Sequence, residues 1–218
     1  MNTTNRKFIK YSDSNWFAPW YVIDSLKKSA GTKNIQGHTE MWIAAMYAIC
    51  RSTLDGSIWW VQFDKRNPPD ARIMRKINKT DSLEITDIEC FELSAHDKKE
   101  SLIESIKRKL IKNNAPRQYG KNTAVVGFVR RSSIVDASYT ELIKNLNPNC
   151  GSLVLIVDEK NEQTTRSCIQ LFPDYMKVNF DFKANGRKDT QNPLMTTHRK
   201  GTLPIINEGE IVDVEMFP

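Results

Sequence analysis

The fold is decided by residues 67–93, which read NPPDARIMRKINKTDSLEITDIECFEL. Two stretches within it, 70–77 and 82–93, are rich in branched residues and predict β-strands, and the polar run between them predicts a turn. Asp70 opens the first strand, and Glu84 lies on the second, fourteen residues later. Carboxylates on adjacent strands can converge on one divalent cation, because hard cations prefer oxygen ligands. We therefore expect a carboxylate pair at this hairpin.

The segments on either side predict an alternation of helices and strands. An almost wholly apolar helix is expected over 40–51, with Thr39 as its N-cap, and such a helix must be buried against a sheet. The remaining predicted elements are helices over 15–30, 98–113 and 136–146 and strands over 57–63, 122–130, 152–157 and 168–172. Strands that first meander and then alternate with helices favour an α/β fold with a mixed β-sheet flanked by helices.

Length and composition favour one folded domain. A chain of 218 residues, 39% of them hydrophobic, can bury a substantial core. We expect a single α/β domain over 1–182, with its core at about 39–130, and a polar C-terminal extension over 183–218. The longest apolar run, 41–50, is far too short to span a membrane, and the N-terminus lacks a secretory signal. We therefore expect a soluble, cytoplasmic protein.

The cysteines are expected to be free thiols, buried or half-buried. Cys50, Cys90, Cys150 and Cys168 form no Cys-x-x-Cys pair, and the three histidines are not spaced to complete a zinc site with them. Gly-rich phosphate loops, Ser/His/Asp sets and His-based metal motifs are absent from the sequence. These absences exclude P-loop NTPases, serine hydrolases and zincins.

The two acidic motifs resemble those of the PD-(D/E)XK nuclease superfamily. Pro69-Asp70 is similar to its PD motif, and Glu84-Ile85-Thr86 is similar to its (D/E)XK motif, except that Thr86 replaces the lysine. The resemblance covers about residues 39–129 and implies a restriction-endonuclease-like core, in which a helix, a three-stranded meander, a helix and a strand follow one another. It implies an endonuclease-like protein that depends on Mg²⁺ or Mn²⁺ and hydrolyses phosphodiester bonds in DNA.

The same resemblance implies roles for individual residues. Asp70 would be the central metal ligand, with the carboxylate of Glu84 and the carbonyl of Ile85 beside it. Glu40, on the preceding helix, would support the metal. A slip of one residue along a strand reverses its faces, so Glu89 stays open as an alternative to Glu84 for the second acid.

The missing lysine bears on activity. In the superfamily this side chain neutralises developing charge and helps to orient the attacking water, whereas Thr86 donates a hydrogen bond but carries no charge. The alternative registers of the acid strand, 87–89 and 89–91, also lack a lysine. Some members of the superfamily place the lysine on the following helix, where Lys107 and Lys109 stand in this sequence.

The positive charge of the chain is concentrated in one segment. Residues 105–131 contain eight basic residues and no acidic one, so subtracting them from 32 leaves 24 basic against 26 acidic residues elsewhere. A basic segment beside an acidic site suits binding of a phosphate backbone, although a solvated helix face has the same composition. The candidate nucleic-acid-binding residues are Lys107, Lys109, Lys112, Arg117 and Lys121.

Three interpretations remain open at this stage. The first is a metal-dependent deoxyribonuclease, and the second is a catalytically inactive member of the same fold that binds nucleic acid or a protein. The third is a purely structural α/β domain in which these acids are surface residues. DNA or RNA as the partner, and a monomer or a homodimer as the working state, also stay open. The geometry that discriminates most is whether the carboxylates of Asp70 and Glu84 can share one cation.

Overall fold

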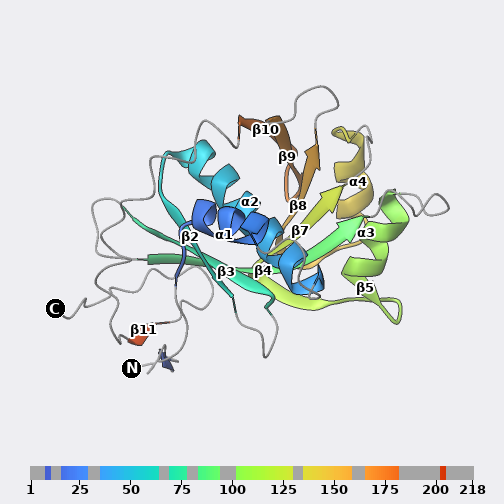
Figure 1. Ribbon diagram of the computed structural model, residues 1–218. Helices are drawn as coiled ribbons and strands as arrows, with labels where there is room; N and C mark the ends of the chain where they lie inside the picture. The colour runs from blue at the N-terminus through green and yellow to red at the C-terminus, as the bar shows by residue number, and fades with distance from the viewer. Residues whose placement is uncertain are drawn as a thin grey trace.

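A seven-stranded mixed sheet forms the centre of the protein (Figure 1). The computed structural model describes residues 8–10, 16–28, 35–63, 69–77, 83–93, 102–129, 135–158, 165–181 and 202–204. The strands of the sheet, in chain order, are β2 (Trp59–Phe63), β3 (Ala71–Lys76), β4 (Leu83–Leu93), β7 (Gln118–Val129), β8 (Asn149–Asp158), β9 (Thr165–Phe172) and β10 (Met176–Asp181). Their order across the sheet is β10-β9-β8-β7-β4-β3-β2.

The strand directions divide the sheet into three parts. β2, β3 and β4 form an antiparallel meander, and β8, β9 and β10 form another. Between them, β4, β7 and β8 run parallel. Each parallel step is made through a helix, α3 (Leu102–Leu110) before β7 and α4 (Ser138–Lys144) before β8, as parallel neighbours require. The predicted α/β fold with a mixed sheet flanked by helices is confirmed.

The helices α1 (Pro19–Lys28) and α2 (Ile35–Asp55) cover one face of the sheet. Every residue of α2 from Ile43 to Cys50 is buried, in a cluster that includes inward-facing residues of β2, β3, β4 and β7. The expected burial of this apolar helix is confirmed. Its predicted start is wrong, because the helix begins at Ile35 and Thr39 lies inside it rather than at its N-cap. Packing of a long apolar face outweighs the low helix propensity of Gly37.

The helices α3 and α4 pack on the opposite face. Leu102, Ile106 and Leu110 recur every four residues along α3 and are all buried in a second apolar cluster with inward-facing residues of β7 and β8. The central strand β7 contributes to both clusters, since Val126 belongs to the first and Val125 to the second. This double coverage explains its near-continuous apolar sequence.

Gly127 fits a close approach between strands on the α3 face. A Cβ atom at this position would lie 2.5 Å from Cζ of Phe91 and 2.8 Å from Cδ2 of Leu155. Those distances are shorter than van der Waals contact, so only glycine fits without movement of its neighbours. The phenyl ring of Phe91 therefore occupies the space over β7 that a side chain would take.

Some elements differ from the prediction at their ends. The helix expected over 98–113 ends at Leu110, and β5 (Ile111–Lys112) and β6 (Ala115–Pro116) form a hairpin directly after it. Asn113 and Asn114 have φ of 52° and 60°, a left-handed conformation that asparagine tolerates and that a two-residue hairpin turn requires. The left-handed conformation of Asn113 and Asn114 is incompatible with continuing α3 through these two residues.

Further strands were not predicted. β10 pairs with β9, and β1 (Phe8–Lys10) pairs with β11 (Thr202–Pro204), so a short strand lies within the segment expected to be a polar extension. All four cysteines are free and buried, as expected. In the described part of the chain no helix is both long and apolar enough to cross a membrane.

Candidate functional site

Asp70 is held against β4 at the point where β3 begins. The ladder between these strands ends at the Ala71–Ile88 pair, so Asp70 lies next to Glu89 in the register. Oδ2 of Asp70 accepts a hydrogen bond of 2.8 Å from the backbone N–H of Cys90. The carboxylate of Asp70 therefore takes the place of a β3 backbone partner for Cys90.

Lys109 reaches the same place from α3. Its Nζ donates a hydrogen bond of 2.9 Å to the carbonyl oxygen of Cys90 and lies 3.6 Å from Oε2 of Glu89. The side chain of Glu89 is 13% exposed and that of Lys109 is 23% exposed, so solvent screens this ion pair only partly. We call Asp70, Glu89, Lys109 and the backbone of Cys90 the acidic cluster.

Electrostatics in the acidic cluster favour a cation. Burial raises the pKa of Glu89, the negative charge of Asp70 raises it further, and the positive charges of Lys109 and Arg117 oppose the rise. The pKa of Glu89 is raised overall. Lys109 and Arg117 therefore do not fully offset the effects of burial and of the negative charge of Asp70. An added divalent cation would favour the ionised form of Glu89.

A tyrosine hydroxyl and a cysteine thiol lie beside the acidic cluster. The hydroxyl of Tyr119 donates a hydrogen bond of 2.8 Å to the carbonyl oxygen of Lys109, and burial raises the pKa of Tyr119 to about 12. Cys90 directs its Sγ to the carbonyl oxygen of Glu40 at 3.5 Å. Burial raises the pKa of the Cys90 thiol well above its usual value, and Asp70 and Glu40 add to the rise, so the thiol stays protonated. The backbone carbonyl of Glu40 on α2 thus lies beside Cys90, and the expected role of the Glu40 carboxylate at a metal stays a prediction.

Glu84 does not join Asp70. It pairs with Arg75, four residue pairs along the ladder from Ala71 and Ile88. Asp70 lies one position beyond that end, opposite Glu89, so five residues separate it from Glu84, which is about 16 Å along the strand at roughly 3.3 Å per residue and too far to share one cation. The expected metal pair of Asp70 and Glu84 is therefore not formed, and Glu89, the alternative left open by the sequence, lies beside Asp70 instead. Ile85 packs partly buried against the apolar cluster of Trp16, Trp60, Met74 and Leu83.

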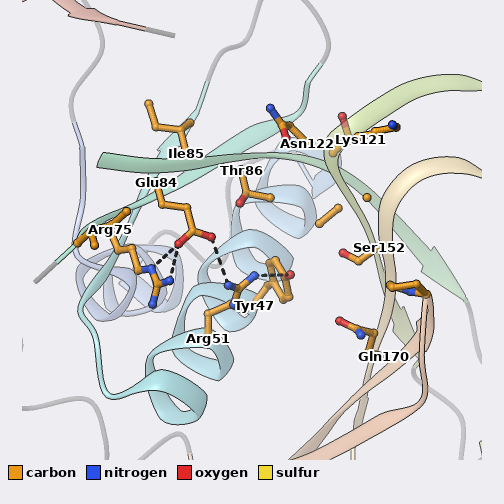
Figure 2. Close-up of a pocket in the computed structure, with 15 residues that line it drawn as sticks. Tyr47, Arg51, Arg75, Glu84, Ile85, Thr86, Lys121, Asn122, Ser152 and Gln170 are labelled. Atoms are coloured by element: carbon orange, nitrogen blue, oxygen red, sulfur yellow. Dashed lines mark hydrogen bonds and ion pairs between the residues drawn. The ribbon is translucent and has the colours of Figure 1, made fainter. Parts of the chain in front are cut away.

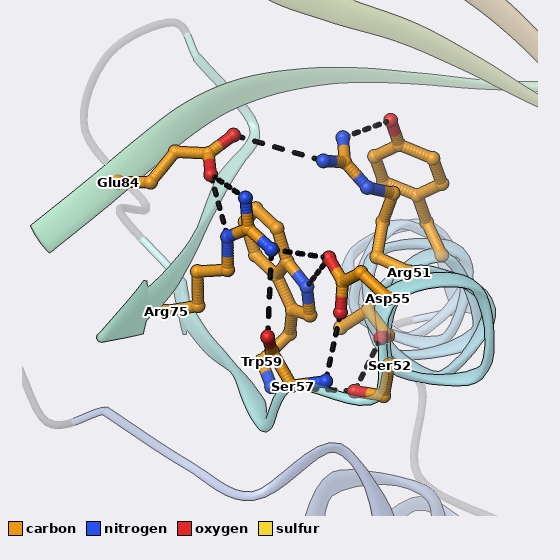
Figure 3. Close-up of polar contacts among 9 residues, drawn as sticks. Arg51, Ser52, Asp55, Ser57, Trp59, Arg75 and Glu84 are labelled. Carbon is orange, nitrogen blue, oxygen red and sulfur yellow. Dashed lines mark hydrogen bonds and ion pairs between the residues drawn. The ribbon is translucent and has the colours of Figure 1, made fainter. Parts of the chain in front are cut away.

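Glu84 belongs to an ion-pair network that explains its place on a largely apolar strand (Figure 3). The guanidinium of Arg75 binds Glu84 on one side and Asp55 at 2.7 Å on the other. Asp55 also accepts a 3.0 Å hydrogen bond from the indole N–H of Trp59. The carboxylate of Glu84 is thereby compensated by protein cations, and no metal is needed to account for it.

A pocket of about 740 Å³ adjoins this network on the α2 side of the sheet (Figure 2). Its polar lining residues include Tyr47, Arg51, Glu84, Thr86, Lys121 and Ser152. Thr86 points into this pocket, whereas Glu89 lies on the face of β4 that carries Phe91 and Leu93 under α3. Position 86 therefore does not face Asp70.

The candidate nucleic-acid-binding residues fall into three groups. Lys107 and Lys112 are exposed on α3 and β5. Lys109 is committed to the acidic cluster, and Arg117 is half-buried close enough to Glu89 to lower its pKa. Lys121 is exposed and lines the pocket on the α2 side. The basic segment is thus not one continuous surface.

The donor set of the acidic cluster fits a hard cation that keeps water ligands. The described residues include no group of three or more His, Cys, Asp or Glu side chains that could hold a metal. Two carboxylates and a nearby main-chain carbonyl remain, and Mg²⁺ commonly binds through one or two carboxylates while it keeps several waters.

Comparison with protein-family models, with curated proteins and with solved structures finds no significant match.

Sequence reasoning missed the part played by Cys90 and Tyr119. Cys90 acts through its backbone N–H and C=O, which carry no sequence signal, and Tyr119 acts on the main chain of α3. The regular spacing of Leu102, Ile106 and Leu110 carried usable information. It fixes the buried face of α3, so Lys109 must lie at the edge of that face.

Proposed function

We propose that the chain is an endonuclease-like protein that uses Mg²⁺ or Mn²⁺ to hydrolyse phosphodiester bonds in DNA. The observation that carries the proposal is the meeting of Asp70, Glu89 and Lys109 at the backbone of Cys90. A carboxylate pair from adjacent strands can hold a divalent cation, and an ammonium beside it can stabilise the charge that develops during metal-assisted phosphodiester hydrolysis.

In this proposal Asp70 and Glu89 hold the cation, and the carbonyl of Cys90 adds a neutral oxygen beside them. When bound, the cation polarises the phosphodiester and lowers the pKa of a bound water. Lys109 supplies the positive charge that Thr86 cannot, by pairing with negative charge that develops on the phosphate. Glu40 supports the site from α2.

The order of elements supports this assignment of roles. α2, β2, β3, β4, α3 and β7 occur in the order that the restriction-endonuclease-like core would have, with the β5–β6 hairpin inserted between α3 and β7. In that core the segment Glu89-Cys90-Phe91 takes the role expected of Glu84-Ile85-Thr86, and Lys109 replaces the lysine that neither segment contains.

A binding protein without catalysis is the second candidate, and one contact favours it. Lys109 already donates to the Cys90 carbonyl and pairs with Glu89, so an ammonium stands where a cation would compete. If Lys109 stays there when nucleic acid binds, the acidic cluster stabilises the fold and the exposed Lys107 and Lys112 meet the phosphates.

Nicking of supercoiled plasmid in Mg²⁺ or Mn²⁺ tests the proposal. The wild type should nick the plasmid, and Asp70→Asn, Glu89→Gln and Lys109→Met should each lose about a hundredfold or more of that rate. Glu92→Gln, an exposed position on the same strand, is the matched control and should keep the activity. A folded wild type that binds DNA but never nicks it would leave the binding protein as the better description.

A further inference from the structure

The pocket on the α2 side is separate from the acidic cluster. Figure 2 shows Arg51 and Tyr47 rising from α2, Glu84 and Thr86 pointing down from β4, and Ser152 and Gln170 facing them from the other side. The acidic cluster lies under α3, on the opposite face of β4. A ligand in this pocket would therefore not touch Asp70 or Glu89.

Arg51 makes only long polar contacts with the rest of the protein that the structure describes. In the described part of the chain its polar partners are the hydroxyl of Tyr47 at 3.4 Å and Glu84 at 3.6 Å, both long for a charged donor. A guanidinium has five N–H donors, so most of its donors lack a close acceptor here. Arg51 nevertheless has a fixed position, because its guanidinium lies 4.5 Å from the ring centroid of Trp59.

Arg75 shows what a fully compensated arginine looks like at the same ring. Its guanidinium also lies over Trp59, at 5.1 Å, but it binds Asp55 at 2.7 Å and Glu84 at 2.5 Å. Glu84 is thus closer to Arg75 than to Arg51. The geometry leaves Arg51 held in place with donors available to an anion.

The lining carries an excess of positive charge. Arg51, Arg75 and Lys121 contribute three positive charges, and Glu84 together with Asp55, which binds Arg75, contributes two negative charges, which leaves one. A phosphomonoester carries about −1.5 to −2 at neutral pH, so the positive excess of the lining favours its binding. Arginine and lysine are also the side chains most used to bind phosphate.

The rest of the pocket suits an organic group larger than phosphate. Its volume of about 740 Å³ falls within the usual range of small-molecule sites. Ile77, Ala124 and Pro173 provide apolar lining, and Asn122, Ser152 and Gln170 provide hydrogen-bonding groups. We propose that this pocket binds a phosphomonoester of mononucleotide size, with its phosphate at Arg51. The proposal does not depend on nuclease activity.

Calorimetric titration with each of the four ribonucleoside 5′-monophosphates tests the site. At least one should bind with saturable heat, and the matching nucleoside and inorganic phosphate should each bind about tenfold more weakly or worse. No saturable heat for any of the four would overturn the proposal. A nucleoside that binds as well as its monophosphate would remove the phosphate contact, and phosphate that binds as well as the nucleotide would remove the organic part.

Variants locate the site and protect the test against misfolding. Lys121 is exposed, so Lys121→Gln should fold normally, and the loss of one positive charge from the lining should weaken nucleotide binding by about threefold. Arg51→Gln should weaken it further, with folding checked by circular dichroism. Arg108→Gln makes the same charge change at an exposed position on α3, under the other face of the sheet, and should bind as the wild type does. Wild-type affinity in Lys121→Gln and in a folded Arg51→Gln would exclude this pocket.

Discussion

Lys109 Nζ and the carbonyl oxygen of Cys90 lie 2.9 Å apart, in a hydrogen bond between a helix and a strand. The N–H of the same cysteine is bonded by Asp70 at 2.8 Å. Both backbone groups are available to side chains because the β3–β4 ladder ends at Ala71 and Ile88. The late start of β3 thus creates a place where an acid and a base from different elements meet on one residue.

The first prediction concerns metal binding at this place. Titration of the wild type with Mn²⁺ should show a single site, and Asp70→Asn and Glu89→Gln should each weaken it by at least about tenfold, because each removes a charged ligand. Glu84→Gln should bind Mn²⁺ as the wild type does, since Glu84 is paired with Arg75 and Arg51. Loss of Mn²⁺ binding in Glu84→Gln alone would instead identify Glu84 as a metal ligand, as the sequence first suggested.

The second prediction concerns pH. Because the pKa of Glu89 is raised in the folded protein, the folded state holds a proton that the unfolded state releases, in a window that opens near the usual glutamate value of about 4.3. The stability contribution of Glu89 is full below that value and is lost as pH rises through the folded pKa.

Glu89→Gln removes this titration. In a chelator, the thermal stability of Glu89→Gln relative to wild type should therefore rise as the pH increases from about 3.5 to 7. Mn²⁺ should reduce the difference at pH 7, because only the wild type keeps the ligand. A difference that stays constant over the whole pH range would contradict the raised pKa.

The third prediction concerns the position where the superfamily motif has lysine. Thr86 lines the pocket on the α2 side and does not face Asp70, so Thr86→Lys should not increase plasmid nicking. It should instead strengthen binding of a nucleoside monophosphate, because it adds a cation beside Arg51 and Lys121. Increased nicking by Thr86→Lys would mean that the acid strand has a different register.

Particular residues show how far the sequence could lead. The 3.6-residue period of Leu102, Ile106 and Leu110, and the apolar runs in β7 and β8, predicted helices and strands because burial imposes those patterns. Local pattern alone was enough for these elements. Lys109 was one of two candidates for the displaced lysine because some members of the resembled superfamily carry that lysine on the following helix.

The pairing of Glu84 with Arg75, and of Asp70 with Glu89, could not be predicted in the same way. Both depend on the register of β3 against β4, and several acids on β4 satisfy the motif equally well. The register is decided by packing, with Ala71, Ile73 and Ile88 all buried in the cluster under α2. The spacing of residues within one strand does not specify its pairing register with a strand elsewhere in the chain.

The fourth prediction tests the packing that holds β4 against β7. Gly127→Ala should destabilise the protein by about 1–3 kcal/mol, because the new Cβ would meet Phe91 and Leu155 at less than contact distance. Urea unfolding measures the change. Phe91→Leu in the same chain should recover part of it, and strict additivity of the two substitutions would show that the clash is relieved elsewhere.

The fifth prediction concerns DNA. If the exposed Lys107 and Lys112 meet phosphates, affinity for duplex DNA should fall steeply with salt, and each lost contact should reduce the slope of log affinity against log salt by about 0.9. The double variant Lys107→Gln/Lys112→Gln should therefore flatten the slope by roughly two units. Lys144→Gln, which makes the same charge change on α4, where Lys144 pairs with Glu141 and Asp174, should leave it unchanged. Equal slopes for the double variant and the wild type would assign Lys107 and Lys112 to an ordinary solvated surface, and any DNA bound by the acidic cluster would then approach from elsewhere.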